Sequence, residues 1–293
     1  MVIKIYLYFF VYAFLGWCTE VVYAAITEGK FVNRGFLNGP YCPIYGFGVI
    51  AVTEILKPIH GNFFLLFFGS VVVTSIIELI TGFILEKIFN TRWWDYSDKP
   101  FNIGGYICPL FSLLWGIGCL VVVDKIHPMI SELVSLIPDI PAIFILITLT
   151  ITFVIDLIAT VNTIFKLNKK LERIEELSAI IKKSSDELGE SLAEGAITLA
   201  VKKEEIEDIL YQSKEKIEER IENTKRVVDT DIAAMLQNKK ESLEHKKHAL
   251  NKELFETNIF DHRRLLNAFP GLKSQQNKEA LKILKEHINK KYK

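Results

Sequence analysis

Long apolar stretches alternate with short polar segments over the first 165 residues of the chain. Residues 5–26 form an apolar run that carries a single charge, and three further runs of similar length follow it. An α-helix rises about 1.5 Å per residue, so about 20 apolar residues cross a hydrocarbon core of roughly 30 Å. The pattern predicts membrane-spanning helices at residues 5–26, 63–85, 104–123 and 142–165.

A shorter apolar segment, residues 41–56, leaves two interpretations open. It contains a proline, two glycines and an acidic residue, so it is either a short crossing or a re-entrant segment. The basic residues favour five crossings, because the loops at 27–40 and 86–103 and the basic stretch from Lys166 then share one side of the membrane. This topology puts the N-terminus outside the cell and the segment after residue 165 in the cytoplasm.

The pattern changes at about residue 167. Leucine and isoleucine recur at three- and four-residue steps, and later at seven-residue steps, among many lysines and glutamates. This is typical of long helices in a coiled coil or a helical hairpin. We therefore expect an all-α fold, with a polytopic membrane helix bundle over residues 1–165, a cytoplasmic coiled-coil-like helical region over 166–260 and a basic tail over 261–293.

The charge of the chain is divided unevenly, although 35 basic and 35 acidic side chains sum to zero. Residues 1–165 hold eight basic and eleven acidic residues, whereas residues 261–293 hold nine basic and three acidic residues. Such a tail suits the anionic lipids of the inner leaflet, and a solvated helix face is the plainer alternative. No nucleic-acid-binding module accompanies the charge, so nucleic acid is not an expected partner. The helical region predicts self-association or a partner protein.

An internal repeat is visible when residues 9–34 are laid over residues 67–92. The alignment needs no gap, and it matches polar residues at fixed spacing: Glu20 with Glu78, Glu28 with Glu86 and Arg34 with Arg92. A Cys-Pro pair follows in each copy, at residues 42–43 and 108–109. The first four apolar segments therefore predict two parallel copies of one unit, followed by a fifth span.

Glu20 and Glu78 are predicted to lie within the membrane, on helix stripes that also carry small residues. Small residues allow membrane helices to approach closely, so we expect the two carboxylates to face each other or a common cavity. A charge at the centre of a span costs roughly 2.5–3.5 kcal/mol on insertion scales. Either Arg34 and Arg92 pair with the carboxylates in a structural role, or the two glutamates share a proton or a cation, which is the interpretation we favour. Asp156 lies within the last span and either lines a pathway or sits near the inner interface.

The two basic loops contribute further candidates. Asn33 and Arg34 in the first loop and Arg92 and Asp95 in the second are candidate gating residues. The adjacent tryptophans at residues 93 and 94 favour anchoring at the lipid headgroups.

Cys42 and Cys108 occupy matching positions of the repeat. They are candidates for a redox pair or for a thiolate site that holds a metal or haem, and free, partly buried thiols are the plainer alternative in a reducing cytoplasm. No cofactor is predicted. The sequence lacks an H-E-x-x-H motif, a nucleophile elbow and a G-x-x-x-x-G-K-[ST] phosphate loop, so we expect no enzymatic activity of the chain itself.

Several polar runs within the apolar region resemble a known family. They are FLGWCTE at residues 14–20, NRGFLNGPYCPIYGFG at 33–48, WWDYS at 93–97 and NIGGYICPLFSLLWG at 102–116. They are similar to a family of integral membrane proteins of bacteria labelled putative ABC-transporter type IV permease. The resemblance covers roughly residues 1–165. It implies a multi-pass protein of the bacterial cell membrane that acts as a transporter component, with its ATPase on a separate chain.

Two rival functions stay open. The first is a membrane-anchored scaffold or stress sensor that acts through its cytoplasmic coiled coil. The second is a redox or haem-handling membrane protein that uses Cys42 and Cys108.

Overall fold

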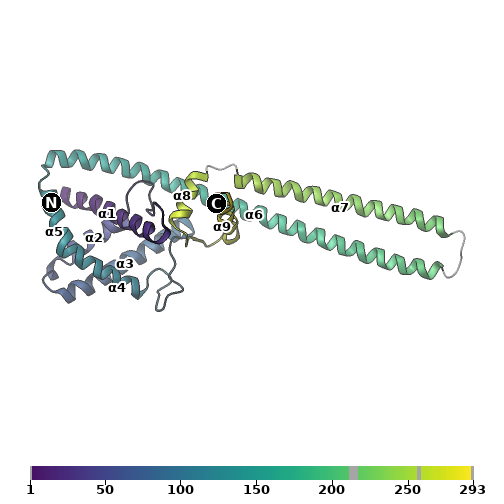
Figure 1. The fold of residues 1–293 in the computed structure, drawn as a ribbon, viewed down its shortest axis with the longest axis horizontal. Coiled ribbons are helices and arrows are strands. Elements are labelled where there is room, and N and C mark those ends of the chain that lie inside the picture. Colours follow the sequence, from purple (N-terminus) through teal and green to yellow (C-terminus); the bar gives the residue numbers. More distant parts are fainter. Residues whose placement is uncertain (1, 211–216, 256–258, 292–293) are drawn as a thin grey trace. The chain divides into compact units, whose positions relative to one another are not determined.

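The computed structural model describes residues 2–210, 217–255 and 259–291, and this part of the chain is mostly helical (Figure 1). It forms two compact units, one comprising Met1–Lys169 with Asn258–Lys293 and the other Lys170–Thr257. The elements of the first unit up to the long helix are α1 (Val2–Glu28), α2 (Pro43–Ile55), η1 (Lys57–Ile59), α3 (Phe63–Phe89), β1 (Thr91–Arg92), α4 (Pro109–Val121), η2 (Val122–Ile126) and α5 (His127–Ser135). The long helix α6 (Asp139–Leu210) passes from the first unit into the second.

Local sequence signals explain where these helices begin and end. Helices α2 and α4 have 13 residues each, and each begins at a proline that directly follows a cysteine. Proline suits the first helical turn because its missing N–H would have no partner there. Helix α3 begins where the Asn62 side chain accepts a hydrogen bond from the Leu65 N–H at 3.1 Å, and it ends at Asn90, whose φ of 49° is left-handed.

Within the part of the chain that the structure describes, four helical segments are long and apolar enough to cross a membrane: α1, α3, Pro109–Ser135 and the first part of α6 within Asp139–Lys202. The expectation of several helices long and apolar enough to span a membrane, followed by a long charged helix, is therefore confirmed. Helix α2, with 13 residues, rises only about 20 Å, which is less than the roughly 30 Å of a hydrocarbon core. The number of crossings and the repeat stay predictions.

The helix predicted at residues 104–123 begins later and ends later than expected. Gly104 and Gly105 have φ values of 59° and 73°, and the first helical residue is Pro109. These left-handed conformations suit glycine and do not continue a right-handed helix. At the other end, the helix passes through the π-helical segment η2 into α5, and the combined segment ends at Ser135.

Among the described residues, two apolar clusters contribute to the core of the first unit. One joins α2, α3 and α4 through buried side chains that include Val52, Leu66 and Leu120. The other joins α1, α5 and the start of α6. Polar contacts tie α1 to the second cluster, since the Tyr12 hydroxyl lies 2.9 Å from His127 Nδ1.

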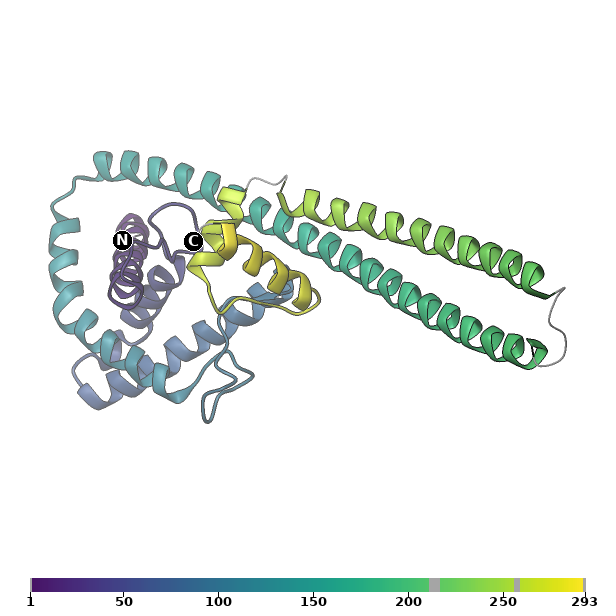
Figure 2. The same ribbon diagram turned by 45° about the vertical axis from the view of Figure 1, so that its right-hand side comes forward.

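Helix α6 continues without a break past residue 165, where the membrane region was expected to end. No proline or other helix-breaking signal separates its apolar part from its charged part, so the two share one helix. In the second unit, residues 170–210 of α6 and helix α7 (Ile217–Phe255) run side by side in both views (Figures 1 and 2). Lys246 Nζ donates a hydrogen bond to Ser184 Oγ at 2.8 Å, and Lys239 contacts Ser191 in the same way.

The C-terminal segment folds back onto the first unit. It comprises α8 (Ile259–Ala268), β2 (Lys273–Ser274) and α9 (Lys278–Lys291). Strand β2 pairs antiparallel with β1, so that Thr91 lies opposite Ser274. The loop after α3 and the C-terminal segment therefore lie on the same side of the helix bundle.

Candidate functional site

The first element of the site is Glu20 on α1. Its Oε1 accepts a hydrogen bond of 2.6 Å from the Tyr45 hydroxyl on α2, and its Oε2 lies 3.3 Å from Arg34 Nε. The close approach of α1 to α2 depends on Gly16, because a Cβ atom at this position would overlap the Tyr45 ring. Glu20 is thus a half-buried carboxylate with both a hydroxyl and a guanidinium beside it.

The second element is Glu78 on α3, whose environment is different. Its side chain is buried with 8% exposure, and its Oε1 accepts a hydrogen bond of 3.2 Å from the Tyr96 hydroxyl. Within the part of the chain that the structure describes, Glu78 Oε2 is buried without a hydrogen-bond partner. A buried carboxylate oxygen without a partner is costly, so Glu78 is the group most in need of a proton or a cation.

Tyr96 connects the two glutamates. It interacts electrostatically with Glu20 as well as with Glu78, and it also interacts with Tyr45. Burial and the neighbouring Glu78 charge raise the pKa of Tyr96 above its usual value, so its hydroxyl stays a hydrogen-bond donor. Glu20, Tyr45, Tyr96 and Glu78 therefore form one polar cluster, which we call the carboxylate cluster.

The two tyrosines of this cluster were not found from the sequence. In the predicted repeat, Tyr45 corresponds to Phe111, which has no hydroxyl. The Tyr96 ring stacks on the Phe111 ring with a centroid distance of 4.8 Å. The Tyr96 hydroxyl donates a hydrogen bond to Glu78, just as the Tyr45 hydroxyl donates one to Glu20. The missing hydroxyl at residue 111 was the only signal in the sequence for a substitute donor.

Removal of the Tyr96 hydroxyl is expected to destabilise the protein. In Tyr96→Phe, Glu78 Oε1 loses its hydrogen bond and, like Oε2, is left without a described partner. An unsatisfied buried group costs about 1–3 kcal/mol. The matched variant Tyr45→Phe is expected to lose less, because Glu20 keeps Arg34 beside it. Unfolding of the two variants in mixed detergent micelles measures the difference. Equal losses would contradict the special position of Glu78.

The arginines of the two loops differ in their partners. Arg34 lies beside Glu20 and 3.9 Å from Glu28. Arg92 pairs instead with Glu86, at 2.7 Å from Nε to Oε2, and with Asp95 at 3.4 Å. In one interpretation of the sequence, each arginine pairs with the membrane glutamate of its own repeat. Arg34 does pair with Glu20, whereas Arg92 pairs with Glu86 and Asp95 and not with Glu78.

Asp156 of α6 holds the first loop in place. Its carboxylate accepts hydrogen bonds from the backbone N–H groups of Asn38 at 3.1 Å and Gly39 at 2.7 Å, and from the Asn38 side chain at 2.9 Å. Asn33 stabilises the same loop from within, because its Oδ1 accepts a hydrogen bond of 2.7 Å from Trp17 Nε1. Both residues shape the loop next to the carboxylate cluster and make no described contact with Glu20 or Glu78.

The C-terminal segment contacts both basic loops. Arg264 donates hydrogen bonds to the carbonyl oxygens of Gly35, Phe36 and Leu37 at 2.9–3.1 Å. Lys273 Nζ lies 2.6 Å from Asp95 Oδ2 in the second loop. We call this set of contacts the C-terminal clamp. None of it was expected from the sequence, which indicated only a basic tail.

The contact between Asp95 and Lys273 predicts a pH dependence. Burial by itself would raise the pKa of Asp95, but hydrogen bonds from Lys273 and Ser97 outweigh it and hold this pKa well below the usual range. The ionised form is therefore favoured in the folded state, and its stabilisation is lost as the pH falls below about 4, the ordinary value for Asp. Pepsin is expected to cut the C-terminal segment faster below this pH. If the Asp95→Asn variant showed the same acceleration of cleavage at low pH, the Asp95–Lys273 contact would not be its cause.

Trp93 does not anchor the protein in the lipid headgroups, as its position in the loop had suggested. Its side chain is buried with 5% exposure, and it packs edge-on against Phe269 of the C-terminal segment and Phe36 of the first loop. Protein atoms thus cover the ring that was expected to face lipid. The neighbouring Trp94 donates a hydrogen bond from Nε1 to the Tyr106 carbonyl at 2.9 Å.

The two repeat-related cysteines, Cys42 and Cys108, are buried and free. Each precedes the first residue of a helix, α2 or α4. Among the described residues, no group of three or more His, Cys, Asp and Glu side chains is placed to hold a metal ion. The redox and haem interpretations of these thiols stay untested predictions.

Comparison with known protein families identifies a match. The model of the family described as "Putative ABC-transporter type IV" matches residues 7–161, which is more than half of the chain. No curated protein and no solved structure matches the chain. The matched region contains most of α1, the helices α2 to α5, the apolar start of α6 and the whole carboxylate cluster.

Proposed function

Because the chain belongs to the "Putative ABC-transporter type IV" family, we propose that it is an integral membrane transport component. Its long apolar helices are suited to contact with the lipid bilayer. The sequence has no phosphate-binding loop of the Walker type, so the energy source in this proposal is an ATPase on a separate chain. We propose further that the carboxylate cluster is the site at which transport is coupled.

The observation that carries this proposal is the contrast between the two glutamates. Ionisable side chains within membrane helices are costly and mark functional sites by default. Arg34 compensates Glu20 at 3.3 Å, but Glu78 is 8% exposed and has one oxygen without a described partner. We propose that Glu78 carries a proton at rest and releases it when the cluster rearranges, since a neutral carboxyl is the cheapest buried state.

The loops around the cluster give this proposal a gating element. Arg34 and Asn33 in the first loop and Arg92 and Asp95 in the second are held by ion pairs and hydrogen bonds. A displacement of the first loop would move Arg34 away from Glu20 and change the charge next to Tyr96. In this proposal the two loops form the gate, and the hydrogen bonds from Asn38 and Gly39 to Asp156 hold the first loop in place.

The proposed topology has five crossings in a bacterial cell membrane, the N-terminus outside and the C-terminal segment inside. Support comes from the C-terminal clamp, because Arg264 contacts the first basic loop and Lys273 the second. Both loops and the C-terminal segment then share one side, as five crossings require. In this arrangement the basic α9 helix lies near the anionic inner leaflet.

Gentle affinity purification of the full-length protein from its own membrane tests the transport function. We expect a nucleotide-binding subunit to co-purify, and the complex to hydrolyse ATP after reconstitution into vesicles. Absence of any nucleotide-binding chain under mild extraction would refute the ABC-type assignment.

A second candidate function is a membrane-anchored scaffold or stress sensor. The observation in its favour is that residues 170–257 form a separate unit of long charged helices, which is suited to self-association or to binding a partner protein. Replacement of residues 171–256 by a short flexible linker distinguishes the two functions. Transport predicts that coupled ATP hydrolysis persists, whereas the scaffold function predicts loss of the partner and of all activity.

A further inference from the structure

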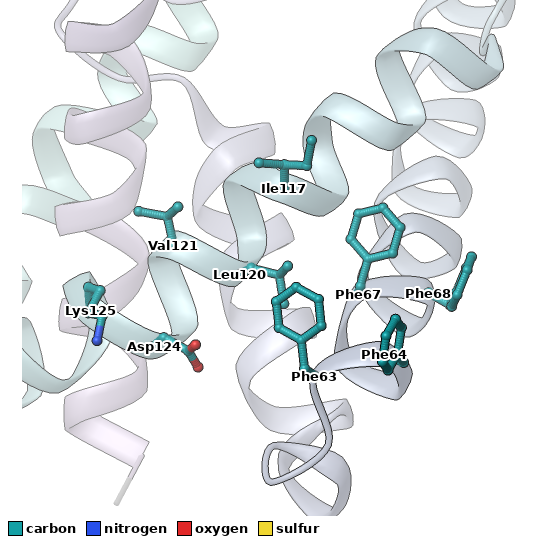
Figure 3. Close-up of a pocket in the computed structure, with 9 residues that line it drawn as sticks. All are labelled: Phe63, Phe64, Phe67, Phe68, Ile117, Leu120, Val121, Asp124 and Lys125. Carbon is teal, nitrogen blue, oxygen red and sulfur yellow. The ribbon is translucent and has the colours of Figure 1, made fainter.

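An apolar groove lies between α3 and the end of α4 (Figure 3), and none of its lining residues belongs to the carboxylate cluster. One wall consists of four phenylalanines at the start of α3: Phe63, Phe64, Phe67 and Phe68. The other wall is formed by the end of α4, including Ile117 and Leu120. The groove has a volume of about 600 Å³, which is within the range of small-molecule binding sites.

The floor of the groove is part of the packed core. Leu120 is buried with 9% exposure in the cluster that joins α2, α3 and α4, and Phe67 packs against this cluster. A Cβ atom at Gly116 would lie 3.0 Å or less from Phe67 and Val71, so α3 and α4 touch directly behind the groove. The outer wall remains open, since Phe64 and Phe68 are 70% and 60% exposed. The groove is therefore preformed and accessible from the side.

The groove ends at a pair of opposite charges. Asp124 and Lys125 line it from the π-helical segment η2, and π-helical turns within α-helices are frequent at functional sites. Figure 3 shows Asp124 pointing toward Phe63, at the end of the groove. Fifteen residues separate Asp124 from Pro109, a rise of about 23 Å. The charged pair therefore lies near the membrane surface opposite to the basic loops.

In the predicted repeat, this surface corresponds to one that is covered by another helix. Phe67 and Phe68 correspond to Phe9 and Phe10 of the first copy. Those two side chains are buried, and each packs edge-on against Phe153 of α6 at centroid distances of 5.8–5.9 Å. In the second copy no helix of the described chain takes the place of α6, and Phe68 stays 60% exposed.

We propose that this groove is a binding site for one zwitterionic phospholipid of the leaflet opposite to the basic loops. The acyl chain lies between the phenylalanines of α3 and the end of α4. The headgroup meets the charged pair, with its phosphate at Lys125 and its ammonium group at Asp124. An anionic phospholipid offers a partner for Lys125 but none for Asp124, so the charge pair selects a phospholipid with an amine headgroup.

Native mass spectrometry of the full-length protein tests this site. The protein is reconstituted into vesicles of equal parts phosphatidylethanolamine and phosphatidylglycerol, extracted in mild detergent and examined for retained lipid. We expect one retained phosphatidylethanolamine per chain and at least fivefold less in Ile117→Trp, whose indole fills the groove. Ile151→Trp on α6 is the matched control, because Ile117 and Ile151 are equally exposed at 54% and residue 151 is outside the groove.

A double variant tests whether the charged pair recognises the headgroup. Asp124→Asn with Lys125→Gln is expected to keep lipid retention but to abolish the preference for phosphatidylethanolamine. Equal retention of both lipids by the unaltered protein would overturn the proposal, and so would unchanged retention in Ile117→Trp. A disulfide-linked dimer of Phe64→Cys in the membrane would show that a protein helix, and not a lipid, occupies the groove.

Discussion

Replacement of both Glu20 and Glu78 by glutamine is expected to abolish activity while the protein still inserts into the membrane. Glutamine keeps the size of the side chain, so the packing of α1 on α2 and of α3 on α4 is preserved. The change removes the only carboxylates of the cluster, and with them the proton that we assign to Glu78. A loss of about 3 kcal/mol in binding a proton or cation corresponds to a roughly hundredfold lower affinity. We therefore expect the rate of ATP hydrolysis by the reconstituted complex to fall at least a hundredfold.

The control for this prediction is Glu132→Gln, which changes an exposed glutamate of α5 and should leave hydrolysis within twofold of the unaltered protein. Loss of the double variant from the membrane would favour the structural role, in which Glu20 serves mainly to pair with Arg34 at 3.3 Å. Full activity of an inserted double variant would refute a function for the cluster.

Replacement of Arg264 by alanine is expected to release the C-terminal segment from the first loop. One guanidinium donates to three backbone carbonyl oxygens, of Gly35, Phe36 and Leu37. Hydrogen bonds to charged groups contribute about 1.5–3 kcal/mol each and are not additive, so we expect a loss of about 3 kcal/mol in the free energy of docking. Hydrogen exchange of the amides in α8 and in the first loop should then be roughly a hundredfold faster.

The matched control is Lys282→Ala on α9, which removes an exposed basic residue of the same segment. It should leave the exchange rates of α8 and of the first loop unchanged. Equal acceleration in both variants would mean that the segment is held by its general charge and not by the Arg264 contacts.

The outline of the membrane region could be predicted from the sequence because it depends on local properties. Apolar length identifies spans, and a charge within an apolar run stands out, which is how Glu20 and Glu78 were found. Helix ends are harder to predict. Gly104 and Gly105 have positive φ values, which a right-handed helix does not allow, so α4 begins only at Pro109. The continuity of α6 was missed because the boundary was drawn from a change in composition, which a helix does not need to follow.

The contacts that build the site could not be predicted, because they join distant residues through loops of different length. Tyr96 is 18 residues from Glu78, and Asp156 is 118 residues from Asn38. Arg264 lies 229 residues after Gly35. No periodicity links such positions. Only the folded chain therefore reveals that Tyr96 donates to Glu78, that Asp156 holds the first loop and that the C-terminal clamp exists.

Infrared difference spectroscopy of the reconstituted protein tests most directly whether Glu78 carries and releases a proton. A pH step across the vesicle membrane should change the band of a protonated carboxyl group, and this change should be absent in Glu78→Gln but present in Glu132→Gln. The same carboxyl band change in Glu78→Gln as in the unaltered protein, or no change in either, would contradict the account.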